Sequence, residues 1–98
     1  MIVTISFNAA PGKRDRLVDL LAEILPDTRA FDGCNDVMLT ERTGTPGALM
    51  LIEDWESAEH YEAYKNWRSE SGTSVLGTDL VDKSSLDSNT FIQIAHPS

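Results

Sequence analysis

Two histidines, His60 and His96, are the side chains whose ordinary pKa lies nearest to neutral pH. Imidazole is a common general base, so either could remove a proton from a bound molecule. His60 stands among acidic and aromatic residues, whereas His96 falls at the end of the last expected strand. The alternative for His60 is an exposed histidine on an acidic helix with no role in chemistry. Of the two, His60 is the candidate base.

Four aromatic side chains gather between positions 55 and 67. They are Trp55, Tyr61, Tyr64 and Trp67. Flat rings of this kind can line a slot for a planar ligand. At helical spacing they can equally fill the core between a helix and a sheet. The sequence leaves both interpretations open.

Other reactive groups give weaker signals. Cys34 is the single cysteine and has no histidine near it in sequence, so a small buried hydrophobe is favoured over a nucleophile. The acidic stretch Glu53, Asp54 and Glu56 is expected to be a solvated edge or a charge at the start of a helix rather than a metal site, because successive strand residues point to opposite sides. Glycine-rich phosphate loops, nucleophile elbows and metalloprotease motifs do not occur in the sequence.

Composition narrows the class of protein. The chain has 98 residues, with 16 acidic and 8 basic side chains and a formal net charge of −8. This length suits one core, so we expect a single domain over residues 1–98. The acidic balance disfavours nucleic acids as partners. No apolar run approaches the length of a membrane span and no signal-peptide pattern is present, so we expect a cytoplasmic protein.

The first half of the chain predicts a strand, a helix and a hairpin. Apolar and polar residues alternate over residues 2–8, as in a strand with two unlike faces. Leucine and isoleucine then recur at helical spacing from Leu17 to Leu25. We expect this helix to continue, kinked, through Pro26, since a stop there would leave a long loop. Strands over residues 34–42 and 48–55 flank a glycine-rich turn.

The second half predicts another helix and a final strand. Ser57 is placed to cap a helix that runs to about Glu70. Residues 71–89, rich in Ser, Gly, Thr and Asp, are expected to form a partly helical connection, and residues 90–96 a last strand. The order β-α-β-β-α-β predicts an α+β ferredoxin-like sandwich, in which both helices cover one face of an antiparallel sheet.

The other face of the sheet also needs a cover. The run Leu49-Met50-Leu51-Ile52 is apolar on both faces of its strand. A two-layer domain with one wet sheet face has no use for such a pattern. We therefore expect a homodimer in which a second subunit covers this face.

One stretch of the sequence has the character of a family signature. It consists of Glu53-Asp54-Trp55-Glu56-Ser57-Ala58-Glu59-His60-Tyr61-Glu62-Ala63, and Ile24-Leu25-Pro26 and Asp32-Gly33-Cys34 precede it. With these residues the chain resembles the antibiotic biosynthesis monooxygenase family and its quinol monooxygenase members. The likeness covers most of the chain. It implies a dimeric α/β barrel, in which two sheets pack face to face and each subunit keeps a pocket between its sheet and its helices.

The resemblance also implies a chemistry. Characterised members oxygenate polycyclic phenols or quinols with O₂ and without metal or flavin, and the substrate anion supplies the first electron. Such a protein needs an apolar slot, hydrogen bonds to the phenolate and a proton acceptor. On this basis Trp55, Tyr64 and Trp67 are expected to wall the pocket. Asn8 is expected to bind the substrate oxygen, with His60 as the base.

The chain departs from the family pattern at several positions. Quinol monooxygenases of this kind often carry two histidines where this sequence has Tyr64 and Ser69, and anthrone-oxidising members have an asparagine where Leu51 stands. Related haem-degrading proteins need a histidine just after the second helix, which this chain does not have. These departures favour the alternative function, a non-catalytic dimeric barrel that binds a small aromatic ligand.

Overall fold

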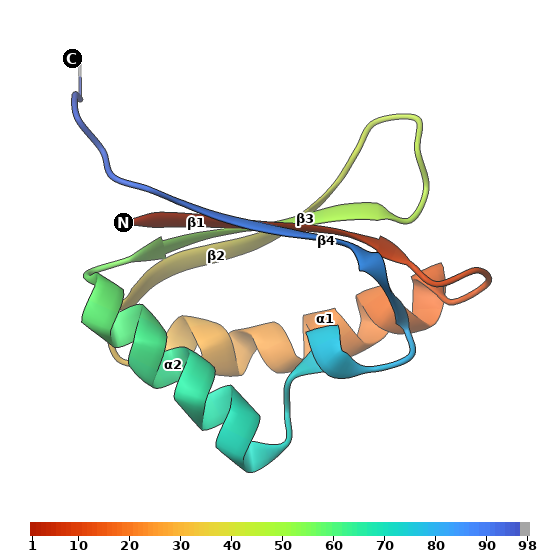
Figure 1. Cartoon of the computed structure of the whole chain (residues 1–98), viewed down its shortest axis with the longest axis horizontal. Helices are drawn as coiled ribbons and strands as arrows, with labels where there is room; N and C mark the ends of the chain where they lie inside the picture. Colours follow the sequence, from red (N-terminus) through yellow and green to blue (C-terminus); the bar gives the residue numbers. More distant parts are fainter. Residues whose placement is uncertain (97–98) are drawn as a thin grey trace.

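The helices and strands follow the expected order. In the computed structural model, which describes residues 1–96, they are β1 (Ile2–Ala9), α1 (Arg14–Ala30), β2 (Cys34–Glu41), β3 (Ala48–Trp55), α2 (Ala58–Ser71), a short 3₁₀ helix η1 (Val75–Gly77) and β4 (Val81–Phe91). The strands form one antiparallel sheet in the order β2-β3-β1-β4. Both helices lie on one face of it (Figure 1). The ferredoxin-like sandwich is therefore confirmed; positions 97 and 98 of the expected domain lie outside the described residues.

Alternation along the central strands separates a buried face from an open one. Val3 and Phe7 of β1 are buried beneath the helices. Their partners on β3, Glu53 and Leu49, are buried on the same side. Because side chains alternate along a strand, Thr4 and Ser6 of β1 face away from the helices. The core therefore lies between the sheet and the helix layer.

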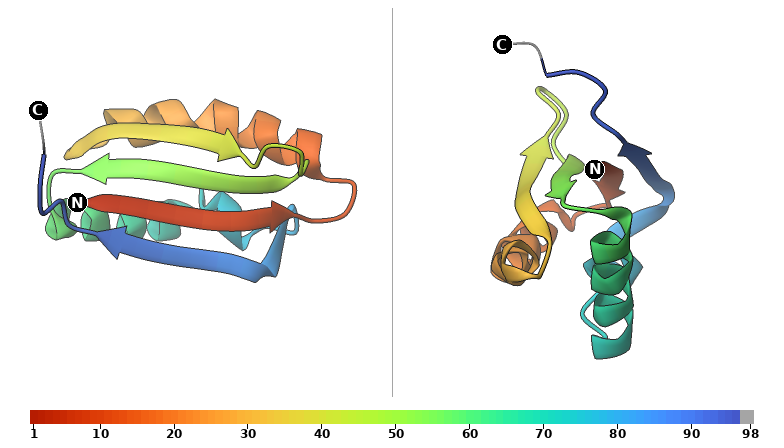
Figure 2. Two further views of the ribbon diagram at one scale, coloured as in Figure 1. Left: turned by 90° about the horizontal axis from the view of Figure 1, so that it is seen from above. Right: turned by 90° about the vertical axis from the view of Figure 1, so that its left-hand side faces the viewer.

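The open face of the sheet carries apolar side chains. No helix covers it in either view of Figure 2. Here Thr4 pairs with Ile52 and Ser6 with Met50, and Met38 of β2 stands opposite Ile52. Met38 is 47% exposed. The apolar residues that led us to expect a covering subunit thus lie where such a subunit would bind.

The first helix continues past its proline. Pro26 lies inside α1, which ends at Ala30, so the expected continuation is confirmed. Phe31 follows with an extended backbone and donates its N–H to the carbonyl of Thr28. Gly33 then turns the chain into β2 with a φ of 88°. Continuation beyond the proline brings Thr28 within reach of α2.

The second helix has the cap that the sequence predicts. The Ser57 side chain accepts a hydrogen bond from the His60 N–H at 3.2 Å. Gly72 ends the helix in the left-handed conformation, with a φ of 68°. Within residues 1–96, no helix has the length and apolar content that crossing a bilayer requires.

The last strand lies earlier in the chain than predicted. We expected it at residues 90–96, but β4 spans Val81–Phe91, and residues 92–96 have no regular structure. The expected connection is therefore helical only at η1. β4 is an edge strand that pairs with β1, from Ala9 opposite Val81 to Ile2 opposite Phe91. An exposed edge accepts polar side chains, so backbone pairing overrides their low strand propensity.

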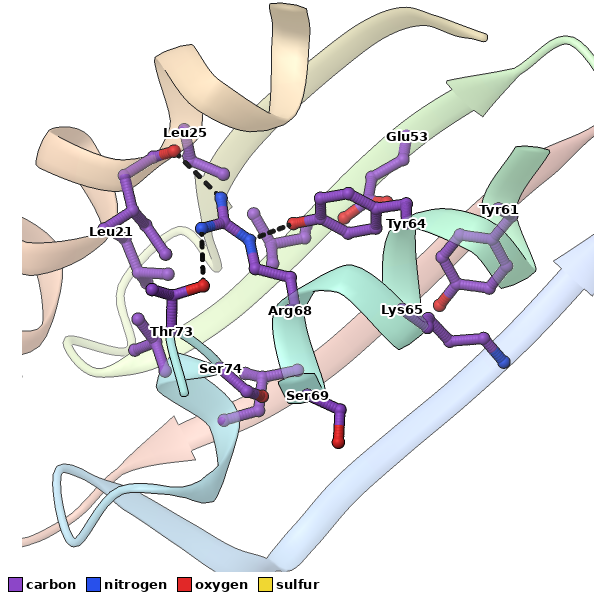
Figure 3. A pocket seen from close by; sticks show the side chains of 14 residues that line it. Leu21, Leu25, Glu53, Tyr61, Tyr64, Lys65, Arg68, Ser69, Thr73 and Ser74 are labelled. Atoms are coloured by element: carbon purple, nitrogen blue, oxygen red, sulfur yellow. Dashed lines mark hydrogen bonds between the residues drawn. The ribbon is translucent and has the colours of Figure 1, made fainter. Parts of the chain in front are cut away.

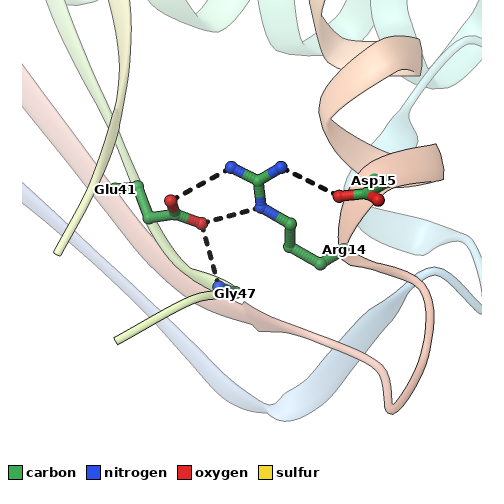
Figure 4. A network of polar contacts seen from close by, with 4 residues as sticks. All are labelled: Arg14, Asp15, Glu41 and Gly47. Carbon is green, nitrogen blue, oxygen red and sulfur yellow. Dashed lines mark hydrogen bonds and ion pairs between the residues drawn. The ribbon is translucent and has the colours of Figure 1, made fainter. Parts of the chain in front are cut away.

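An ion pair ties the start of α1 to the β2–β3 hairpin. Arg14 Nε and Nη2 donate to Glu41 Oε2 and Oε1 at 2.9 and 3.0 Å (Figure 4). Glu41 Oε2 also accepts the Gly47 N–H at 2.9 Å. These contacts, with the Arg14 hydrogen bond as the largest cause, lower the pKa of Glu41 to about 2. The Arg14–Glu41 ion pair lies at the opposite end of β3 from Trp55.

Candidate functional site

A cavity of about 300 Å³ opens between the sheet and the helices. Its apolar wall comes from α1, β3 and η1, through Leu21, Ile24, Leu25, Leu51, Val75 and Leu76. Its polar side comes mainly from β3 and α2 and includes Glu53, Tyr61, Tyr64, Lys65, Arg68 and Ser69 (Figure 3). An apolar pocket with a few convergent polar groups is the usual form of a small-molecule site.

Glu53 is the buried carboxylate of this cavity. It is 2% exposed, and its Oε1 accepts a hydrogen bond from Trp55 Nε1 at 2.8 Å. Within residues 1–96 no second hydrogen bond reaches this carboxylate, and no fully buried side-chain nitrogen or oxygen is left without a partner. The Oε2 atom is therefore not fully buried, and Glu53 is one of the residues that line the cavity. Burial raises the pKa of Glu53, and the Trp55 hydrogen bond and the Arg68 charge offset only part of that effect.

The expectation of a solvated acidic edge is wrong for Glu53. The signal that identifies it is the period of two along β3, which places Glu53 on the same face as Leu49, Leu51 and Trp55. An acidic residue between two buried positions of a strand lies in the core unless the strand ends first.

Tyr64 and Arg68 join α2 to α1 beside the cavity. The Tyr64 hydroxyl lies 2.8 Å from Thr28 Oγ1 and accepts Arg68 Nε at 2.9 Å. Arg68 is 5% exposed and also donates to the Ile24 carbonyl at 3.0 Å and to Thr28 Oγ1 at 2.8 Å. Since Arg68 only donates, both hydroxyl oxygens accept from it, and either hydroxyl can donate to the other. This network holds the helices apart at a fixed spacing above the sheet.

Two further polar residues of α2 lie along the cavity. Tyr61 is 7% exposed, and burial is the main cause that raises its pKa to about 12. Lys65 Nζ lies 4.8 Å from the centre of the Tyr61 ring and forms an ion pair with Glu62 at 2.8 Å. Tyr61 is therefore a neutral hydrogen-bonding group at neutral pH, and Lys65 a cation at the rim.

The aromatic residues divide between the cavity and the core. Tyr61 and Tyr64 line the cavity, whereas Trp55 and Trp67 are not among its lining residues. Trp55 is fully buried, and its ring centre lies 4.9 Å from that of Tyr64. The rings of Tyr64 and Trp67 both pack on Phe31, with centroid distances of 5.4 Å. The tryptophans thus support the cavity wall from behind.

His60 lies at the start of α2, away from the cavity lining. Its Nδ1 is 2.6 Å from Ser57 Oγ, and its Nε2 is 3.7 Å from a carboxylate oxygen of Asp32. Its ring packs on Gly33, where a Cβ atom would come within 2.3 Å of it. The predicted base and the predicted wall residue Tyr64 are on the same helix, but only Tyr64 faces the cavity.

Asn8 lies on the other side of the sheet. Its neighbour Phe7 is buried beneath the helices, so the Asn8 side chain projects from the open face. There it borders a separate depression together with Thr40, Met50 and Ser85, and its N–H donates to Ser85 Oγ at 2.8 Å. The structure therefore does not bring Asn8 together with Tyr64.

Cys34 and the acidic residues form no metal centre in the described structure. Residues 1–96 contain no cluster of three or more metal-ligating side chains. Cys34 is half-buried, and its Sγ lies 3.6 Å from the Asp36 carbonyl. Burial raises the pKa of its thiol, which disfavours the reactive thiolate.

Known proteins match this chain in sequence and in fold. The family model for antibiotic biosynthesis monooxygenase matches residues 1–70. No curated protein matches the chain. A candidate antibiotic biosynthesis monooxygenase of Deinococcus radiodurans is 19% identical, with a TM-score of 0.83 over 100% of this chain and 97% of that one. Another, from Chloroflexus aurantiacus, is 21% identical, with a TM-score of 0.74 over 100% and 98%. Rv0793 of Mycobacterium tuberculosis is 25% identical, with a TM-score of 0.73 over 99% and 97%.

Proposed function

Since this chain belongs to the antibiotic biosynthesis monooxygenase family, we propose that it is a cofactor-independent monooxygenase of a small phenolic or quinol-like aromatic compound. The observation that carries the proposal is the cavity between sheet and helices, where an apolar wall meets one buried carboxylate. An aromatic ring bound there contacts Leu51 and the ring of Tyr64, both of which line the cavity. The reaction belongs in the cytoplasm, where the lone thiol of Cys34 stays reduced.

The proposed reaction needs only substrate and O₂. An ionised quinol passes one electron to O₂, and the resulting superoxide and substrate radical combine at a ring carbon. Breakdown of the peroxide leaves one oxygen atom on the ring and releases the other as water. The substrate supplies all four electrons and both hydrogens of that water, so the equation balances. The protein contributes binding, orientation and removal of a proton.

We also propose that the chain is a homodimer with the open faces of two sheets packed together as an α/β barrel. Met38, Met50 and Ile52 lie on that face, and Phe91 at its edge is 51% exposed. An obligate interface of this kind commonly buries more than about 2,000 Å² and is rich in apolar side chains. Asn8 then lies inside the barrel. It would contact a substrate only if the substrate extended beyond the cavity described above.

An isotope experiment tests the oxygenase directly. The protein is incubated with reduced menadione or anthrone under ¹⁸O₂ in metal-chelated buffer, while an electrode records oxygen uptake. We expect one labelled oxygen atom in the product for each O₂ consumed. Heat-denatured protein gives the rate of spontaneous oxidation. Uptake no faster than this background, with both substrates bound, would count against the oxygenase.

The second candidate function is ligand binding without catalysis. It is favoured by three of the departures from the family pattern, because Leu51, Tyr64 and Ser69 all line the cavity. The ligand would then occupy the same space and meet the same aromatic wall. Saturable binding of menadione, measured by quenching of tryptophan fluorescence, together with background oxygen uptake is the result that this function predicts.

A further inference from the structure

Five charged or ionisable side chains line the cavity, and three of them are poorly suited to accept a proton from a ligand. Arg68 is a cation that only donates hydrogen bonds. Lys65 is paired with Glu62 at 2.8 Å. The Tyr64 hydroxyl is held by Thr28 and Arg68, at 2.8 and 2.9 Å. Among the charged and ionisable residues that line the cavity, this leaves Tyr61 and Glu53.

Tyr61 is a poor proton acceptor because its phenol is neutral until about pH 12. Glu53 has the opposite character. One carboxylate oxygen, Oε1, is fixed by Trp55 Nε1 at 2.8 Å, which orients the whole group. The other oxygen, Oε2, has no hydrogen-bond partner in residues 1–96, and the residue lines the cavity. We propose that Glu53 is the catalytic base that removes the hydroxyl proton of the aromatic substrate, an inference that rests on the proposed oxygenase function.

The proton transfer is balanced within the site. The O–H bond of the bound phenol or quinol breaks, and a new O–H bond forms at Glu53 Oε2. The negative charge moves from the carboxylate to the substrate oxygen, while Oε1 keeps its bond to Trp55. The cavity therefore holds one negative charge before and after the step. The positive charge of Arg68, close enough to Glu53 to act on its ionisation, favours an anion at either oxygen.

This arrangement defines the class of substrate. A neutral aromatic molecule with a hydroxyl group can donate to Oε2 and then become the anion that reacts with O₂. An aryl methyl ether of the same shape has no proton to give. A ligand with its own carboxylate would place a second negative charge beside a desolvated one, which is costly. Glu53 thus selects neutral hydroxyaromatic compounds.

The test uses 4-nitrophenol, whose ionised form absorbs in the visible, over a pH series in which the free dye is neutral. Binding to the wild-type protein should produce the nitrophenolate band. Glu53→Gln keeps an oxygen for Trp55 but cannot take the proton, so it should bind the dye without the band. The matched control is His60→Gln, which should behave as the wild type. Loss of the band in His60→Gln and not in Glu53→Gln would overturn the inference.

A second measurement needs no variant. 4-Nitroanisole, the methyl ether of the dye, should bind the wild-type protein more weakly than 4-nitrophenol because it cannot donate to Glu53. Equal affinities, or no binding of 4-nitrophenol, would contradict the inference. In turnover with reduced menadione, Glu53→Gln should lower the rate by about 10²- to 10⁴-fold. If the wild-type protein ionises the dye but takes up no oxygen with reduced menadione, the oxygenase is refuted and Glu53 remains the proton acceptor. If Glu53→Gln turns over reduced menadione at the normal rate, Glu53 is not the base and the oxygenase stands.

Discussion

Trp55 Nε1 donates to Glu53 Oε1 at 2.8 Å, between two side chains that stand two residues apart on the buried face of β3. Each group satisfies the other, since Trp55 is fully buried and its indole N–H has to find an acceptor inside the protein. The pair forms within a single strand because side chains two residues apart share a face. Its stability and its chemistry are therefore coupled to the ionisation of Glu53.

Trp55→Phe should destabilise the protein more at neutral pH than at acid pH. The folded-state pKa of Glu53 is raised above its ordinary value of 4.5. Ionisation of Glu53 therefore lowers the free energy of unfolding as the pH rises from 4.5 through the folded-state pKa. The Trp55 hydrogen bond favours the charged form of Glu53 and so reduces this loss of stability. A bond to a charged group contributes about 1.5 to 3 kcal/mol, which adds to the packing lost with the indole.

Urea unfolding at a pH below 4.5 and at neutral pH measures this difference. The matched control is Trp55→Phe in a Glu53→Gln background, where the carboxylate is absent and the cost of the tryptophan change should no longer depend on pH in this window. An equal cost of Trp55→Phe at both pH values in the wild-type background would show that the bond does not act on the charged form.

Gly33→Ala should destabilise the fold more than Gly44→Ala. Both glycines have a positive φ, 88° and 78°, so alanine is strained at either position. At Gly33 the new Cβ would also come within 2.4 Å of the His60 Cβ, whereas at Gly44 it meets no heavy atom within 4 Å in the described chain. The difference between the two variants in urea unfolding isolates the contact between Gly33 and α2.

Replacing His60 by alanine should not rescue Gly33→Ala. Alanine keeps the Cβ atom, and that atom is already too close. The double variant should therefore remain less stable than Gly44→Ala. Full recovery in the double variant would show that the imidazole ring, and not the approach of the helix backbone, sets the spacing at this end of α2.

Much of this fold could be predicted from periodicity, but the edge strand could not. The pattern of apolar residues fixes the faces of β1 and β3, and the leucines of α1 define its buried stripe. β4 carries polar residues at most positions and is held by backbone pairing with β1. Such pairing depends on the neighbour in space and leaves little trace in side-chain type.

The site was harder to predict than the fold for a related reason. Tyr64 lines the cavity. The buried carboxylate of the cavity belongs to Glu53, which in the sequence looks like one of several surface acids. Asn8 and Tyr64 were expected to share a pocket, but they lie on opposite faces of the sheet. A sequence gives the alternation of one strand; it does not show which face meets the helices until the whole sheet is assembled.

Glu41→Gln should remove part of the stability that the protein loses in acid. The pKa of Glu41 is lowered from 4.5 to about 2, so its ion pair with Arg14 stabilises the fold above that window and is lost as pH falls through it. The variant should be less stable than the wild type at neutral pH, and the difference should disappear as the pH falls through about 2. Acid unfolding followed by circular dichroism measures both limits. Asp15→Asn is the control, because Asp15 is 89% exposed and should change little.

Ile52→Glu should convert the proposed dimer into a folded monomer. Ile52 lies at the middle of the open face, between Met38 of β2 and Thr4 of β1. A carboxylate at the centre of an apolar interface loses its water without gaining a partner, which opposes association strongly. In the monomer the same side chain faces solvent, so the fold should persist. Light scattering gives the mass, and circular dichroism shows that the chain stays folded.

Two variants make this result specific to the open face. Arg16→Glu places a new carboxylate on the exposed side of α1 and should leave the dimer intact. Leu51→Glu changes the neighbouring residue, which is 5% exposed on the cavity side, and should destabilise the fold instead of the interface. A wild-type mass of one chain at micromolar concentration would disprove the dimer. A dimer that survives Ile52→Glu but dissociates with Arg16→Glu would place the interface on the helices, where it would leave the open face of the sheet in water.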